Sequence, residues 1–88
     1  MRTKYMLWLA AKARVEEEIV DIEPGSTILD LLLRVRENNK GLAKYIDEIL
    51  SGRSEIIVLH NSSQPAFGLR TTLRDGDTIV LIPPVSGG

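Results

Sequence analysis

Residues 74–88 read RDGDTIVLIPPVSGG, and this stretch decides the fold because it holds a turn, a strand and a stop in one run. Asp75-Gly76 is a turn dipeptide. The run at 78–82 is apolar after its first residue and rich in β-branched side chains, which predicts a buried strand. Pro83-Pro84 donates no backbone hydrogen bond, so the strand has to end there and the chain has to run extended beyond it. The stretch therefore predicts a last strand followed by a short projecting tail.

The tail consists of Val85, Ser86, Gly87 and Gly88. Glycine has no Cβ, so a Gly-Gly end is the thinnest backbone available and can enter a narrow channel with its α-carboxylate leading. The four residues reach roughly 13 Å at about 3.3 Å each. We expect one domain over residues 1–84 and a flexible tail over 85–88. The alternative is a Gly-Gly end that arose by chance or as a cloning scar.

Composition excludes several classes of function. Lys and Arg number 11 against 12 Asp and Glu, which is too balanced for the basic stripe that a nucleic-acid ligand requires. The chain has no cysteine, so it forms no disulfide and carries no sulfur on a thiol of its own. No apolar run approaches the roughly 18 residues of a membrane-spanning helix. The basic and apolar N-terminus imitates a signal peptide but is short for one, so we expect a cytoplasmic protein.

The rest of the chain predicts a small α+β domain. Strands are expected at residues 5–9, 18–22 and 55–59, with a loop at 10–14 and one further short edge strand inside the irregular segment 61–73. The two early strands are close enough in sequence to pair with each other. Helices that pack on one face of the sheet complete the pattern.

Two helices are expected in the middle of the chain. Thr27 and Asp30 have the spacing of a capping box, which predicts a helix that starts after Thr27 and ends near Gly41. A second, shorter helix is expected over residues 42–50. Apolar residues at helical spacing give each helix one buried stripe, and they are Ile28, Leu31, Leu32 and Val35 in the first and Leu42, Tyr45, Ile46 and Ile49 in the second.

An apolar face should remain on the sheet. The strands at 55–59 and 78–82 are apolar at both parities, and helices cover only one face. We therefore expect a protein-binding surface that includes Phe67, Val80 and Ile82, with Trp8 or Met6 near the tail. The alternative is that the segment 61–73 folds over this face, with Phe67 as its plug.

The charged and titratable residues give no catalytic pattern. His60 is the single histidine, and no Ser/His/Asp or metal-ligand spacing surrounds it. Glu16-Glu17-Glu18 and Arg14 are interpreted as solvated surface. We expect neither a metal site nor catalysis by the chain alone.

Residues 74–88 resemble the C-terminus of the small subunit of molybdopterin synthase, a ubiquitin-like sulfur carrier. Ala11 and Arg14 are similar to the Ala-x-x-Arg segment of that family, and the element order matches over nearly the whole chain. The resemblance implies a ubiquitin-like β-grasp fold, with a mixed four- to five-stranded sheet, helices on one face, and the first and last strands parallel at its centre. The thiamine-pathway carrier is shorter and typically lacks a second helix, so residues 42–50 favour the molybdopterin relative. The segment 60–69 is longer than is usual in the family, which leaves partner specificity open.

The resemblance also implies a function for the tail. A ubiquitin-activating-type adenylyltransferase, using ATP and Mg, would adenylate Gly88, and a sulfur donor such as a cysteine desulfurase or a rhodanese-like protein would convert it to a thiocarboxylate. Gly88 would then donate sulfur inside the large subunit of molybdopterin synthase, in molybdenum or tungsten cofactor synthesis. Gly87 would give steric clearance and Pro83-Pro84 the exit direction, while the chain itself would hold no permanent cofactor. The alternatives are a protein modifier conjugated through Gly88, a sulfur carrier for tRNA thiolation, and an interaction module whose tail is never activated.

Overall fold

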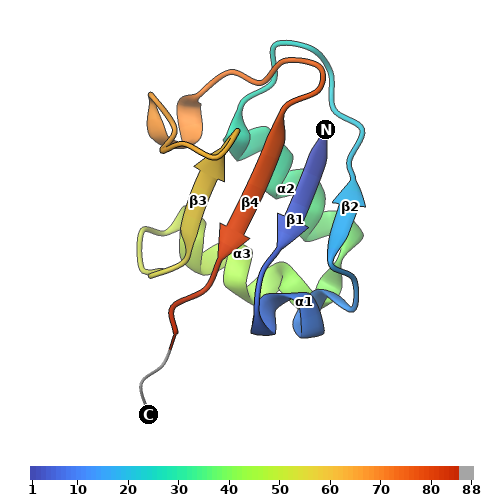
Figure 1. Cartoon of the computed structure of the whole chain (residues 1–88), viewed down its shortest axis with the longest axis vertical. Coiled ribbons are helices and arrows are strands. Elements are labelled where there is room, and N and C mark those ends of the chain that lie inside the picture. Colours follow the sequence, from blue (N-terminus) through green and yellow to red (C-terminus); the bar gives the residue numbers. More distant parts are fainter. Residues whose placement is uncertain (86–88) are drawn as a thin grey trace.

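The computed structural model describes residues 1–85, and the described residues form one four-stranded mixed sheet with helices on one face (Figure 1). Three of the tail residues, Ser86, Gly87 and Gly88, lie outside the described residues. The elements in chain order are β1 (Arg2–Tyr5), α1 (Trp8–Ala13), β2 (Glu17–Ile19), α2 (Ile28–Asn38), the 3-10 helix η1 (Lys40–Leu42), α3 (Ala43–Leu50), β3 (Ile57–His60), the 3-10 helix η2 (Gly68–Arg70) and β4 (Thr78–Ile82).

The strand order is β2-β1-β4-β3, with β1 parallel to β4 and both edge strands antiparallel to their neighbours. The first and last strands are therefore paired at the centre, which confirms the mixed ubiquitin-like β-grasp fold. The bounds of β4 are those expected from the sequence. Ile79 and Leu81 are buried under the helices and alternate with residues on the opposite face.

Helix α2 begins as its capping box predicts. The Thr27 hydroxyl accepts a hydrogen bond from the Asp30 amide at 3.3 Å, and the Thr27 amide donates to the Asp30 carboxylate at 2.9 Å. These bonds satisfy backbone donors that the first turn leaves free. All four residues of the expected stripe, Ile28, Leu31, Leu32 and Val35, are fully buried, and Leu42 and Ile46 of the next helical segment join them in the core.

The expected strand at 5–9 and loop at 10–14 are wrong. β1 already ends at Tyr5, and residues 8–13 form the helix α1. The strand stops because Leu7 has a φ of 52°, in the left-handed region, which turns the chain out of the sheet. Leu9 and Ala13 are four positions apart and both buried, so the apolar run serves a helix rather than a longer strand.

Smaller differences concern the edges of the sheet. β2 covers Glu17–Ile19 rather than 18–22, but Val20 is buried in the core and Ile22 packs against it. β3 is shifted towards His60. Within the described residues, the segment 61–73 holds η2 and isolated bridges in place of the expected edge strand.

Glu18 is not a solvated residue of the hairpin, in contrast to the exposed Glu16 and Glu17. Its carboxylate accepts hydrogen bonds from the Tyr5 hydroxyl and from the Asn39 side chain, both at 2.9 Å. Glu18 thereby joins β1, β2 and the end of α2. Burial, followed by the hydrogen bond to Glu18, raises the pKa of the Tyr5 hydroxyl above its usual range.

Gly41 is needed for a reason other than the helix exit expected from the sequence. It lies within η1, and a Cβ at this position would overlap the Lys12 carbonyl oxygen of α1. Glycine therefore allows η1 and α1 to approach each other closely.

A polar cluster closes the turn before β4. Asp77 accepts hydrogen bonds from the His60 ring at 2.8 Å, from the Asn61 side chain at 2.9 Å and from the Arg74 amide at 2.9 Å. Burial alone would raise the pKa of Asp77, but the hydrogen bonds from Asn61, His60 and the Arg74 amide lower it to about 2. His60 therefore has a structural partner in this turn.

We predict that Asp77 stabilises the fold at neutral pH. A carboxyl whose pKa is lowered on folding contributes stability above its unfolded value, and this contribution is lost as the pH falls through the folded value. Asp77→Asn should lower the free energy of unfolding by about 1–2 kcal/mol at pH 7, and the deficit should shrink between about pH 5 and about pH 2. Urea unfolding across this pH range measures it. Asp75→Asn, in the same turn and exposed, is the matched control and should change little. An equal deficit for Asp77→Asn at both ends of the pH range would contradict the role of the charge.

Candidate functional site

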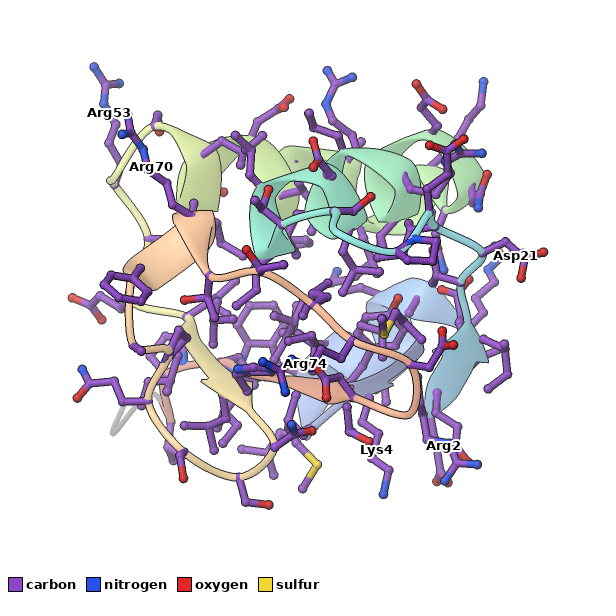
Figure 2. All side chains as sticks on the ribbon, turned by 90° about the horizontal axis from the view of Figure 1, so that it is seen from above. Arg2, Lys4, Asp21, Arg53, Arg70 and Arg74 are labelled. Carbon is purple, nitrogen blue, oxygen red and sulfur yellow. The ribbon has the colours of Figure 1, made fainter. Side chains whose placement is uncertain are left out.

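The face of the sheet opposite the helices is open. We call it the open face. It consists of side chains that alternate along a strand with buried residues, and of the side chains paired with them: Arg2, Lys4, Glu17, Ile19, Ile57, Leu59, Thr78, Val80 and Ile82. Figure 2 shows Arg2 and Lys4 extending on the side of the sheet away from the helices. Strand alternation produces this arrangement, since each central strand sends every second residue to the core.

The open face has an apolar half and a charged half. Val80 lies opposite Leu59, and Ile82 lies opposite Ile57, so β3 and β4 present four aliphatic side chains together. Ile57 is 54% exposed, and the other three are partly exposed. The segment 61–73 packs η2 against α2, on the helix side of the sheet, so it leaves these side chains accessible.

The charged half lies over β1 and β2. Lys4 pairs with Val80 on one side and with Glu17 on the other, and Arg2 lies 3.4 Å from the Glu17 carboxylate. Both partners of this ion pair are about half exposed, so it adds little to stability. An apolar patch bordered by charges is the usual anatomy of a protein-binding surface.

Phe67 lies apart from Val80 and Ile82. It is 77% exposed and therefore is not a plug over the open face. Its segment joins the sheet where β4 begins, whereas Ile82 is the last residue of β4. Figure 1 shows that segment near the start of β4, at the end of the sheet opposite to the one where β4 ends. That Phe67 contributes to an interface stays a prediction, and it would belong to a second area of contact.

The start of the tail is held by side chains from two helices. Pro83 is buried, and the carbonyl oxygen of Pro84 accepts a hydrogen bond from the Trp8 indole at 3.3 Å. The Trp8 ring meets the Tyr45 ring edge to face, with centroids 5.2 Å apart. Trp8 was expected only as an apolar residue of the patch, and Tyr45 only as part of a helix stripe.

A shallow hollow of about 260 Å³ adjoins this point. Trp8, Tyr45 and Pro84 form its aromatic and apolar side, and Glu48, Arg53 and Glu55 are among its charged residues. The only sequence signal for this arrangement is the position of the single tryptophan within the apolar run at residues 5–9. Its partner is 76 residues away in the chain.

Among residues 1–85, no group of three or more His, Cys, Asp or Glu could hold a metal ion. In the same part of the chain, no helix is long and apolar enough to cross a membrane. Three predicted site residues, Ser86, Gly87 and Gly88, lie beyond the described part, while Pro84 and Val85 precede them in the chain.

The chain is similar to proteins of known family and structure. The sequence profile described as the ThiS family matches residues 4–88. None of the curated protein sequences matches the chain.

Solved structures agree with the family match. The crystal structure of SAMP1 from Haloferax volcanii is 30% identical, with a TM-score of 0.85, over 100% of this chain and 98% of that one. The small archaeal modifier protein 1 from Methanosarcina acetivorans is 31% identical, with a TM-score of 0.77, over 99% and 94%. A complex of subunits 1 and 2 of molybdopterin-converting factor from Helicobacter pylori contains a chain that is 22% identical, with a TM-score of 0.63, over 99% and 96%, and this likeness shows the fold.

Proposed function

The chain belongs to the ThiS family of ubiquitin-like sulfur carriers, and on this basis we propose that its Gly88 carboxylate is converted to a thiocarboxylate that donates sulfur in molybdopterin synthesis. The observation that carries the proposal is the place where β4 ends. This central strand leads directly into Pro83-Pro84 at one end of an open face suited to a partner, and the sequence then runs on to Gly87-Gly88. Support also comes from the absence of cysteine, since the sulfur then has to be carried on the terminus.

The proposed chemistry begins with activation. A free carboxylate is a poor electrophile because its charge is delocalised and oxide would be its leaving group. A ubiquitin-activating-type adenylyltransferase, using ATP and Mg, joins the Gly88 carboxylate to AMP and releases pyrophosphate. A sulfur donor, such as a cysteine desulfurase or a rhodanese-like protein, then supplies the sulfur that displaces AMP. If the donor sulfur is a persulfide, a thiol has to cleave the acyl disulfide that forms before the thiocarboxylate is free.

The sulfur is then delivered to a partner that performs the catalysis. We propose that the tail enters the active site of the large subunit of molybdopterin synthase, where its sulfur is transferred to a pyranopterin precursor. Gly87 lets the end pass through a narrow channel because it has no side chain. The apolar half of the open face, with Val80 and Ile82, docks against the same subunit. The complex of subunits 1 and 2 of molybdopterin-converting factor from Helicobacter pylori contains a chain with the same fold, and this likeness is consistent with a partner of that kind.

A second candidate function is protein modification. It is favoured by the two small archaeal modifier proteins, which are 30% and 31% identical over nearly their whole length. A modifier uses the same adenylated glycine, but a lysine amine displaces AMP and forms an isopeptide bond. One carrier can serve both reactions, because they diverge only after activation.

We predict that the chain isolated from its own cell carries a thiocarboxylate on Gly88. Exchange of one oxygen for sulfur adds about 16 Da, which intact-mass spectrometry resolves on a chain of this size. Oxidation of Met1 or Met6 gives a nearly equal shift, so fragmentation has to place the mass on Gly88.

Deleting Gly88, or adding one residue after it, should abolish activation. Either change moves the reacting carboxylate by roughly 3.5 Å, which is beyond the tolerance of a positioned reaction. The melting temperature should stay unchanged in both variants, which serves as the control for folding. A truncated chain that still accepted sulfur and supported dithiolene synthesis would overturn the sulfur-carrier function.

We predict that Ile82→Asp weakens binding to the large subunit by more than about tenfold, because a carboxylate would be desolvated within an apolar contact. The side chain is only partly buried, so the melting temperature should fall by no more than a few degrees. Isothermal titration calorimetry measures the affinity. Ile19→Asp makes the same chemical change on β2, at a side chain that is 69% exposed, and should leave the affinity intact. Equal losses in both variants would argue against an interface centred on β4.

Conjugation has a separate readout. Trypsin cleaves after Arg74, so a modified lysine would carry residues 75–88 as a branched remnant. If this remnant is found on cellular proteins, the chain also acts as a modifier. If the thiocarboxylate is found without it, sulfur transfer is its function.

A further inference from the structure

We propose that Trp8 is a positioning residue for the tail. Its indole N–H holds the Pro84 carbonyl and so sets the direction in which the chain leaves the domain. The inference rests on the proposed function only in taking the tail as the reacting segment. The hydrogen bond itself is a property of the fold.

The hydrogen bonds of the sheet end just before Pro84. The Met6 amide, directly after β1, donates a hydrogen bond to the Leu81 carbonyl at 3.1 Å. This is the last hydrogen bond between β4 and the chain that follows β1. On the other side, β3 pairs with β4 only as far as Ile82. The next two residues are prolines and have no N–H to donate. Among the described residues, the bond from Trp8 is then the one hydrogen bond made by residues 83–85.

The backbone before Trp8 is shaped to place the indole there. Met6 still follows β1 alongside β4, but Leu7 adopts φ 52° and ψ −133°, which a leucine rarely occupies. If the backbone stayed extended after Met6, residue 8 would continue alongside the residues that follow β4. The turn at Leu7 instead starts α1 at Trp8, so that its side chain reaches back to Pro84. Strain of this kind persists only where the surrounding structure enforces it.

Tyr45 of α3 fixes the orientation of the indole. The two rings meet edge to face, with 62° between their planes, and so restrict rotation of the Trp8 side chain. The indole is 38% exposed, and the bond to Pro84 is 3.3 Å long. Such a bond is modest in strength. It therefore biases the direction of the tail and can be released when a partner draws the tail in.

Positioning of this kind has a kinetic signature. A tail that already points in one direction loses less conformational entropy when it enters an active site, so the free energy of binding is more favourable. Removing the bond should raise KM for the carrier by about two- to tenfold, the range expected for one neutral hydrogen bond, and leave kcat within about twofold.

The test exchanges one atom. Trp8 is the single tryptophan, so biosynthetic replacement affects no other position. In 3-benzothienylalanine a sulfur replaces the indole N–H while the ring shape is kept. In 5-fluorotryptophan the N–H remains, which makes this variant the matched control. Tyr45 and the core stay unchanged in both, and melting temperatures verify the fold.

Two readouts separate the outcomes. The first is the residual dipolar coupling of the Val85 N–H in the full-length chain. This coupling should fall towards zero with benzothienylalanine and stay at the wild-type value with fluorotryptophan. The couplings of the β4 amides should change little in either variant. The second is ATP–pyrophosphate exchange by the adenylyltransferase of the source cell, with the KM and kcat effects given above. An unchanged Val85 coupling, or a KM equal to that of the wild type, would overturn the role of Trp8. A wild-type chain that supports no exchange would instead overturn the proposed function, and the coupling would still decide whether Trp8 holds the tail.

Discussion

The parallel pairing of β1 with β4 is the constraint on which the rest of the structure depends. It joins the beginning of the chain to its end, with Thr3 opposite Ile79 and Tyr5 opposite Leu81. Because the two strands run in the same direction, residues that follow β1 lie beside residues that follow β4. Trp8 meets Pro84 for this reason, although neither residue is near the other in sequence. The same pairing buries one face of both strands under α2 and leaves the other face open.

The site divides into two parts with different physical tasks. The open face provides contact area for a protein partner. Its aliphatic side chains on β3 and β4 can exclude water from a contact, and the charged side chains on β1 and β2 border that contact. The tail offers reach, since a chain of small residues passes where a folded surface cannot. Trp8 lies at the junction of the two parts. A partner that binds the open face therefore receives the tail at a defined edge of that face.

Local sequence signals were sufficient for much of the fold. The turn at Asp75-Gly76 and the diproline delimit β4 from both sides, and the capping box delimits α2, because each of these signals acts within a few residues. Helix α1 was missed because the apolar run at 5–9 also suits a strand, and only tertiary contacts, among them those with η1, favour a helix there. The conformation of Leu7 is imposed by tertiary structure and has no local signal.

The candidate site residues show the same division. Val80 and Ile82 could be placed on a face by strand alternation alone, whereas Phe67 could not be placed, because the path of an irregular segment depends on what it packs against. The bond from Trp8 to Pro84 spans nearly the whole chain. Glu18 looked like one charge of an acidic run, and only the fold brings Tyr5 and Asn39 to its carboxylate.

The central position of β4 has a mechanical consequence. A partner that draws the tail into its active site pulls along the axis of this strand. The hydrogen bonds to β1 and β3 lie across that direction, so the load is shared by both ladders at once and they resist as a unit. A strand at the edge of the sheet has one ladder instead of two, so the same pull would be carried by fewer hydrogen bonds. The domain is therefore built to stay folded while its end is under tension.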